Sequence, residues 1–273
     1  AVLGAFIYAF QRNWKWGAVL SALFMGFELS QNHYQVTYYM VILLVGLGIY
    51  FAIDAFKKKT LKNFGLATGG VFVGYLLALF VNYGSVSMTN DYAKHTIRGA
   101  NDLTISANGT EAKSKVGLDK DYITQWSYGK QESFSLLLSN VKGGSSGAII
   151  GSEEEVERLR KEDPGFFNFL VTQYNQKQHV VSTYWGNQPF TSGPVYVGII
   201  VFILAILALF FVKNKLIAAL SVVTILALML SWGKNSMWLT EFFIDYIPVY
   251  NKFRAVAMLL VIVEFTLPVF AVL

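Results

Sequence analysis

Long apolar runs, separated by short polar connections, dominate this chain and restrict the folds open to it. They occupy residues 14–29, 36–53, 64–81, 195–212, 216–232 and 255–273, and residues 1–10 form a shorter one. Since about 20 helical residues cross the hydrocarbon core of a bilayer, the pattern predicts an all-α polytopic membrane protein with about seven spans or partial spans. The composition, 54% hydrophobic and 14% charged residues, agrees with this class.

The basic residues of the short connections predict how the helices are oriented. Three connections carry them: Arg12 and Lys15, then Lys57, Lys58, Lys59 and Lys62, then Lys213 and Lys215. Alternating spans put all three on one side, which the positive-inside rule makes cytoplasmic. Because the positive charge follows topology, the formal net charge of +5 gives no reason to expect nucleic acid as a partner.

The chain divides into three parts by composition. Residues 1–81 and 193–273 are predicted to be transmembrane helices, and residues 82–192 an extracytoplasmic domain. No methionine stands at residue 1 and both ends are apolar, so we expect an internal fragment of a longer polypeptide. The absence of cysteine excludes disulfides and thiolate metal sites.

The extracytoplasmic part is expected to be mixed and partly helical. Ser152 followed by three glutamates predicts a capped helix start, and Asp163 followed by Pro164 predicts a second one. A short strand is predicted at residues 102–105. The glycine-rich residues 142–147 predict a flexible loop or hinge. They lack the GxxxxGK[ST] pattern, so a phosphate-binding loop is not expected there.

Polar residues gather between the second and third spans, in the stretch GFELSQNHYQVTYYM at residues 26–40, which we call the polar turn. The turn faces outward with residues 82–191 and 233–254, so a shared site is expected on that side. Glu28 and His33 are candidates for a general base or a phosphate contact, and Gln35 for substrate binding. Alternatively, these side chains simply meet lipid headgroups and water, where polar residues cost little.

Several stretches resemble a known family. GFELSQNHYQVTYYM resembles an outer-loop pattern of the YfhO-like bacterial membrane proteins, in which a polar run with a histidine and a glutamine precedes an aromatic pair. TIRGANDLT, GLDKDYITQWSYG, YWGNQPFTSGPVYVG and YNKFRAVAM resemble, in the same order, the versions found in Bacteroidetes-type bacteria. The resemblance extends over nearly the whole chain.

This resemblance implies a GT-C type glycosyltransferase in the bacterial cytoplasmic membrane, with its long loop facing outward. The implied substrate is a polyprenyl-phosphate-linked sugar, and the implied acceptor is a cell-envelope glycan or glycolipid, with membrane lipids around both. In that superfamily the acidic residue thought to act as base lies in the first outer loop, between the first two spans. We expect this loop to lie upstream of the chain, which leaves the catalytic residue unknown beyond the candidates Glu28 and His33.

Outer-face cations are the second group of candidates. Arg254 and Lys252 stand just before the last span, against the positive-inside trend. The planar guanidinium suits phosphate oxygens, so Arg254 is a candidate clamp for a lipid phosphate, with Lys252 beside it. The alternatives are contact with headgroups or an ion pair with Glu241 or Asp245 in the same loop.

The long outer segment contributes further substrate-binding candidates. Arg98 offers a cation, and Trp185 and Trp126 offer ring faces for a sugar. Asp119 and Asp121 flank Lys120 and would suit a sugar hydroxyl or a divalent cation, which is the cofactor that such carboxylates suggest. Residues of these types are more often ordinary residues of the fold, which is the alternative for each of them. The lone His95 and His179 have no partner at HExxH spacing, so no metal site is assigned.

Glu264 lies within the last apolar run and supports a different class of function. A buried structural hydrogen bond or a protonated carboxyl is expected there, but intramembrane carboxylates also serve transporters. The alternatives to the glycosyltransferase are therefore a lipid or polysaccharide transporter, against which the absence of visible inverted repeats counts, and a non-catalytic envelope assembly protein.

Overall fold

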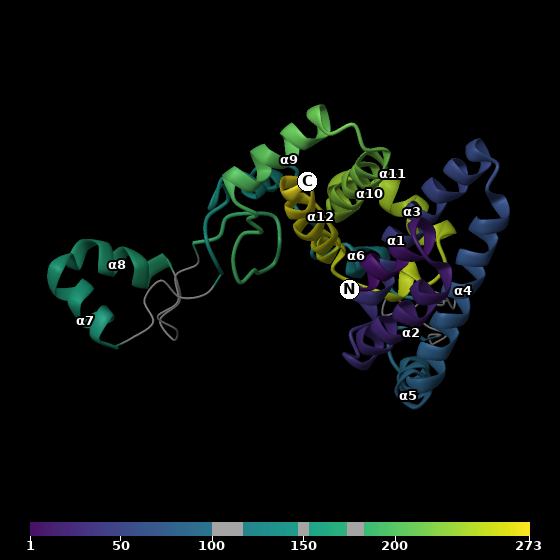
Figure 1. Ribbon diagram of the computed structural model, residues 1–273. Coiled ribbons are helices and arrows are strands. Elements are labelled where there is room, and N and C mark those ends of the chain that lie inside the picture. Colours follow the sequence, from purple (N-terminus) through teal and green to yellow (C-terminus); the bar gives the residue numbers. More distant parts are fainter. Residues whose placement is uncertain (100–116, 147–152, 174–182) are drawn as a thin grey trace.

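The computed structural model describes residues 1–99, 117–146, 153–173 and 183–273 of the chain (Figure 1). Within them the chain forms α-helices, short 3-10 helices and connecting segments, with no strand. The apolar helices are α1 (Val2–Gln11), α2 (Trp14–Ser30), α3 (Tyr34–Lys58), α4 (Leu61–Val81), α9 (Ile199–Phe211), α10 (Lys215–Ser231) and α12 (Leu260–Val272). The predicted all-α class is thereby confirmed for the described residues.

Two of these helices, α3 with 25 residues and α4 with 21, are long and apolar enough to cross a membrane. A third crossing is possible if α10 and the helical stretch that ends at Tyr246 form one broken span, which is bent by 115°. The helices α1, α9 and α12 are apolar but shorter. These lengths support association with a membrane.

The interior forms where α3, α10 and α12 meet. Leu47 of α3, Leu230 of α10 and Val263 of α12 are almost completely buried. The hydroxyl of Thr224 on α10 donates to the hydroxyl of Thr266 on α12 over 2.8 Å. A hydrogen bond of this kind between membrane helices contributes about 0.6 kcal/mol, so packing of the apolar side chains contributes most of the stability.

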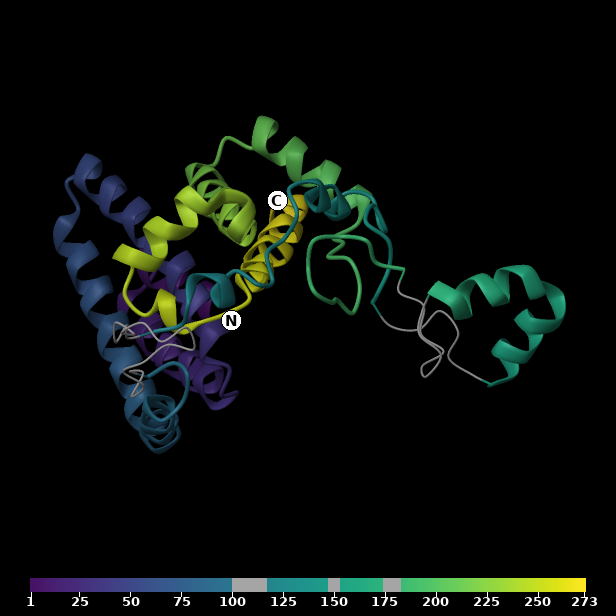
Figure 2. The same ribbon diagram turned by 180° about the vertical axis from the view of Figure 1, so that it is seen from behind.

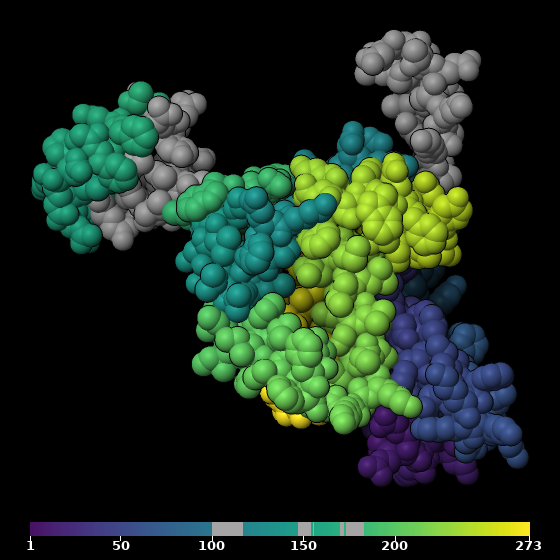
Figure 3. All heavy atoms as spheres, turned by 90° about the horizontal axis from the view of Figure 1, so that it is seen from above, coloured from purple at the N-terminus to yellow at the C-terminus, as the bar shows by residue number. Residues whose placement is uncertain are grey.

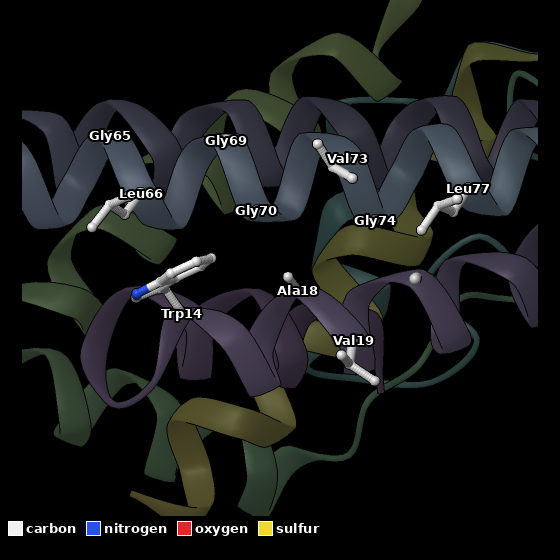
Figure 4. Close-up of a pocket in the computed structure, with 11 residues that line it drawn as sticks. Trp14, Ala18, Val19, Gly65, Leu66, Gly69, Gly70, Val73, Gly74 and Leu77 are labelled. Carbon is white, nitrogen blue, oxygen red and sulfur yellow. The ribbon is translucent and has the colours of Figure 1, made fainter.

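The helices α2 and α4 cross closely at glycines (Figure 4). A Cβ atom at Gly74 would lie 2.6 Å from the Ala18 carbonyl oxygen, and one at Gly70 would lie 3.1 Å from the Ala18 Cβ. A Cβ atom at Gly65 or Gly69 would meet nothing within 4 Å. The four glycines in the apolar run at residues 64–81 predict a close approach of a neighbouring helix, and the structure shows it at two of the four positions.

The basic connections at residues 11–15 and 57–62 lie at the same end of the helices. Arg12 and Lys58 line one polar pocket there. Beneath it, Phe10 of α1 stacks on Phe51 of α3 with ring centroids 4.8 Å apart. This arrangement agrees with the expectation that these two connections share one side; their cytoplasmic orientation stays a prediction.

The structure corrects three boundaries in the C-terminal half. Residues 233–254, expected as a loop, contain the helix α11 (Met237–Tyr246). The helix α9 begins only at Ile199, because Gly198 has a φ of 95° and ends the extended segment before it. Before α12, the residues Val256–Leu259 form a 3-10 helix, since Ala255 adopts a left-handed conformation with φ of 60°.

The polar segment contains α5 (Tyr83–Lys94), α6 (Lys120–Ile123), a 3-10 helix (Gln131–Leu136), α7 (Glu153–Glu162) and α8 (Pro164–Gln173). Both helices predicted after residue 152 are present, and the Asp163 carboxylate caps α8 by accepting from the Phe166 amide over 2.9 Å. The α7–α8 pair lies apart from the other described helices in two opposite views (Figures 1 and 2). The strand predicted at residues 102–105 lies outside the described residues.

The glycine-rich residues 142–146 are held by the chain after residue 183, contrary to the flexible loop expected there. The Trp185 amide donates to the Lys142 carbonyl over 3.0 Å, and the Ser146 amide donates to the Thr191 carbonyl over 2.8 Å. Figure 3 shows the teal surface of residues 117–146 lying against the green surface of the chain after residue 183.

Candidate functional site

Three segments that are distant in the sequence meet at the start of α3. Residues 117–128 run beside residues 250–257, and backbone hydrogen bonds join them. The Leu118 amide donates to the Asn251 carbonyl over 2.9 Å, the Ala255 amide to Ile123 over 3.1 Å, and the Ala257 amide to Trp126 over 3.1 Å. These irregular segments thus satisfy each other's backbone groups, and α3 completes the contact through its first turn.

Gln35 joins the polar turn to the loop before α12. Its side-chain amide lies 2.5 Å from the Arg254 carbonyl oxygen and 2.9 Å from the hydroxyl of the buried Tyr39. Nearby, the Tyr38 hydroxyl donates to the Pro248 carbonyl over 2.8 Å. These contacts give Gln35 a structural role, and its substrate-binding role stays a prediction.

Arg254 is exposed and is held between two aromatic rings. Its guanidinium carbon lies 5.4 Å from the ring centroid of Tyr122 and 5.5 Å from that of Trp126. One guanidinium nitrogen donates to the Tyr122 hydroxyl over 2.5 Å. Contacts of this kind fix the plane of the guanidinium, which leaves its solvent-facing N–H groups oriented for an anion.

The carboxylates expected as alternative partners of Arg254 bind a different cation. The Lys120 ammonium lies 3.1 Å from Glu241 and 3.7 Å from Asp245. The hydrogen bond that Lys120 donates to Glu241 is the main cause that raises the pKa of Lys120. Arg254 therefore makes no ion pair with these residues, and aromatic contacts take their place.

Arg98 and Lys252 form a reciprocal pair. The Arg98 side chain donates to the Lys252 carbonyl over 3.0 Å, and the Lys252 ammonium donates to the Arg98 carbonyl over 3.1 Å. Both side chains are half-buried. The structure thus brings these two predicted residues together and uses their donors to join the end of the residue 83–99 segment to the loop before α12.

Within the polar turn, Glu28 lies in the last turn of α2 and His33 lies just before α3. The half-buried Glu28 carboxylate lies 3.5 Å from the Thr37 hydroxyl, which is its donor. His33 precedes α3 and is exposed, and its side chain does not cap the helix. Glu28 also lines a cavity.

That cavity is a groove of about 420 Å³ between α1, α2, α3 and α12. Its polar members are Glu28 and Gln31, both from the polar turn. The others are apolar: Ala1, Val2, Leu3, Phe24, Phe27, Val36, Met40, Leu43, Val261, Ile262 and Phe265. A groove with an apolar wall and a polar end suits an amphipathic chain such as a lipid.

The remaining candidates lie elsewhere. Trp185 is exposed and stands beside residues 142–143, away from Arg254. The Asp119 carboxylate caps α6 by accepting from the Lys120 amide over 2.8 Å, and Asp121 is exposed. In the described part of the chain, no group of three or more His, Asp or Glu side chains is arranged to hold a metal ion.

Two features of this region escape sequence reasoning. Tyr122, the hydrogen-bond partner of Arg254, is separated from it by 132 residues, and no local pattern connects them. Glu132 is a carboxylate with only 3% of its surface exposed, inside the 3-10 helix Gln131–Leu136 of the polar segment. Glu264, expected to be buried, is exposed on the surface of α12.

Comparison of this chain with family models, curated proteins and solved structures finds no match. The resemblance to YfhO-like proteins therefore stays a prediction. A functional assignment has to rest on the geometry of the polar turn, the groove and Arg254.

Proposed function

We propose that this chain belongs to a GT-C type membrane glycosyltransferase that moves a sugar from a polyprenyl-phosphate donor to a cell-envelope acceptor. The proposal includes the seven spans or partial spans expected from the apolar runs, a bacterial cytoplasmic membrane, and the outward orientation of the polar turn. The resemblance to YfhO-like proteins is part of the same proposal.

One observation carries most of its weight: an apolar groove and a fixed arginine lie at the same end of α3. The groove ends at Glu28 and Gln31, and Gln35 in the first turn of α3 donates to the Arg254 carbonyl. A lipid-linked phosphate needs an apolar channel for its chain and a cation for its head. Arg254 offers such a cation, with its plane fixed by Tyr122 and Trp126.

The chemistry assigns a separate task to each group. In the transfer, the bond between the anomeric carbon of the sugar and the phosphate oxygen breaks, and an acceptor oxygen bonds to that carbon. The acceptor hydroxyl loses its proton to a carboxylate base, and the departing phosphate gains negative charge. Arg254 would stabilise that phosphate. Glu28 is the described carboxylate that lines the groove, and an upstream acidic residue remains the expected base.

The test is transfer by the full-length protein reconstituted with a labelled polyprenyl-phosphate sugar and envelope acceptor lipids. We expect turnover, reduced at least about tenfold in Arg254→Ala because a charge-assisted hydrogen bond is lost. The matched control is Lys234→Ala, an exposed cation in the neighbouring loop outside the Arg254 contacts. The proposal would be refuted if the wild-type protein showed no turnover and did not bind the polyprenyl-phosphate sugar.

A lipid or polysaccharide transporter is the second candidate, and Glu264 favours it. This carboxylate is exposed on α12, the helix that supplies Val261, Ile262 and Phe265 to the groove. A transporter predicts that Glu264→Gln abolishes transport while Arg254→Ala is tolerated, and a glycosyltransferase predicts the reverse. If neither substitution matters, a non-catalytic assembly protein is favoured.

A further inference from the structure

A second cavity lies in the polar segment, apart from the residues assigned above. It has a volume of about 300 Å³ and is lined by Gly129, Lys130, Gln131, Glu132, Lys142, Asn187 and Asn235. We call it the Glu132 pocket. Its lining brings together three stretches of sequence, at residues 129–142, at residue 187 and just after α10.

The wall of this pocket is built around the Glu132 carboxylate. One carboxylate oxygen accepts from the Tyr184 hydroxyl over 2.6 Å, and the other accepts from the Gly129 amide over 2.6 Å. The Tyr128 hydroxyl donates to the Glu132 carbonyl over 2.7 Å. A buried charge is tolerated only with such partners, so the carboxylate occupies a fixed position.

Two glycines keep this position open. A Cβ atom at Gly129 would lie 2.7 Å from one Glu132 carboxylate oxygen. At Gly186, a Cβ atom would overlap the other carboxylate oxygen and the Tyr184 hydroxyl. The sequence around the carboxylate therefore admits little change, which is typical of a formed site rather than of a surface depression.

The charges of the lining select the chemistry of a ligand. The lining contains two lysines, Lys130 and Lys142, and one carboxylate, so its net charge favours an anion. Lys130 also lies over the Trp232 ring, with its nitrogen 5.8 Å from the ring centroid. Asn187 and Asn235 add amides, and the Asn235 nitrogen already donates to the Tyr128 carbonyl over 2.9 Å. This leaves the Asn235 oxygen as an acceptor.

The lining contains no aliphatic or aromatic side chain, which argues against an acyl chain or a nucleobase as the ligand. Amides and a fixed carboxylate suit hydroxyl groups, which both donate and accept hydrogen bonds. The volume is at the lower end of the range for ligand pockets. We propose that the Glu132 pocket binds an acidic saccharide unit, a sugar ring that carries a carboxylate or a phosphate. This inference rests on the pocket alone and does not require the proposed transferase activity.

The test is equilibrium binding to the full-length protein in detergent, followed by the fluorescence of its tryptophans and by calorimetry. The probes are glucuronate and glucose 6-phosphate, with glucose and inorganic phosphate for comparison. We expect both acidic sugars to bind more tightly than glucose and than phosphate. If glucose bound as tightly as the acidic sugars, the role of the lysines would be refuted. If inorganic phosphate bound as tightly, the pocket would be an anion site without sugar recognition, and the proposal would be wrong.

Variants locate the binding. Lys142→Met should weaken binding of the acidic sugars about tenfold, because one charged hydrogen bond is lost, and Asn187→Ala should weaken glucuronate more than phosphate. The control is Lys161→Met, an exposed lysine on α7. Both lining residues are at least partly exposed, so the variants should fold. Unchanged affinity in both would refute the pocket as the site. Failure of sugar transfer would leave this result unaffected.

Discussion

The side-chain amide of Gln35 lies 2.5 Å from the backbone carbonyl oxygen of Arg254, across 219 residues of sequence. This contact links the first turn of α3 to the loop that carries the arginine. The carbonyl belongs to the residue whose side chain lies between Tyr122 and Trp126. The polar turn therefore contacts Arg254 at its backbone carbonyl and not at its guanidinium.

Gln35→Ala should destabilise the protein, because it removes the donor to both Arg254 and Tyr39. At about 0.5–1.5 kcal/mol for each hydrogen bond, the loss is expected at about 1–3 kcal/mol. The free energy of unfolding in mixed detergent micelles measures it. Gln31→Ala, at an exposed position of the same turn, is the control and should have little effect. Equal effects of the two variants would contradict the contact.

Tyr122→Phe and Arg254→Lys should not be additive. Each removes the hydrogen bond between the two side chains, which is 2.5 Å long, and the lysine also loses the planar group that lies over the rings. Both residues contribute to the same contact. The double variant should therefore lose less binding free energy for the polyprenyl-phosphate sugar than the two single variants lose together, and the difference should be about 0.5–3 kcal/mol. A double-mutant cycle of donor binding measures this coupling, and strict additivity would argue against it.

Gly74→Ala should weaken the contact between α2 and α4. The new Cβ atom would lie 2.6 Å from the Ala18 carbonyl oxygen, so the helices must separate. Overpacking of this kind costs about 1–3 kcal/mol. Gly69→Ala on the same helix is the matched control, since its Cβ atom meets nothing within 4 Å. The free energy of unfolding should fall for the first variant and stay equal or rise for the second.

Alkaline pH should destabilise the region around Glu132. Burial raises the pKa of Tyr128 and of Tyr184 above the unfolded value of 10.0, and the hydrogen bond to Glu132 raises that of Tyr184 further. The folded state therefore favours the neutral phenols, and their contribution is complete below pH 10.0 and lost as the pH rises toward the folded pKa. The free energy of unfolding should fall as the pH rises above 10.0. The fall should be shallower in the double variant Tyr128→Phe, Tyr184→Phe. Identical slopes would contradict these shifts.

The sequence predicts the apolar helices well because length and hydropathy are local properties. It places α3 and α4 within a few residues of their ends, and it predicts a close helix contact at the α4 glycines. It does not predict which glycines make the contact, since only the side of α4 that faces α2 decides this. A Cβ atom at Gly70 or Gly74 would meet α2, whereas one at Gly65 or Gly69 would meet nothing within 4 Å.

The helix α11 escapes the sequence pattern because its charged residues resemble those of a loop. Glu241 and Asp245 lie on its exposed side, where they bind Lys120, while Leu239 and Phe243 are buried. The site shows the same difficulty. Arg254 is identifiable from the sequence as an outer cation, but the two rings that fix it come from residues more than a hundred positions earlier, and such contacts exist only in the folded chain.

The backbone hydrogen bonds between residues 117–128 and 250–257 also have a consequence for biosynthesis. The chain is made from its N-terminus, so residues 117–128 are synthesised well before residues 250–257 emerge. During that interval the carbonyls of Ile123 and Trp126 lack these partners and depend on water. Residues 117–128 therefore complete these backbone hydrogen bonds only after the loop before α12 has been made.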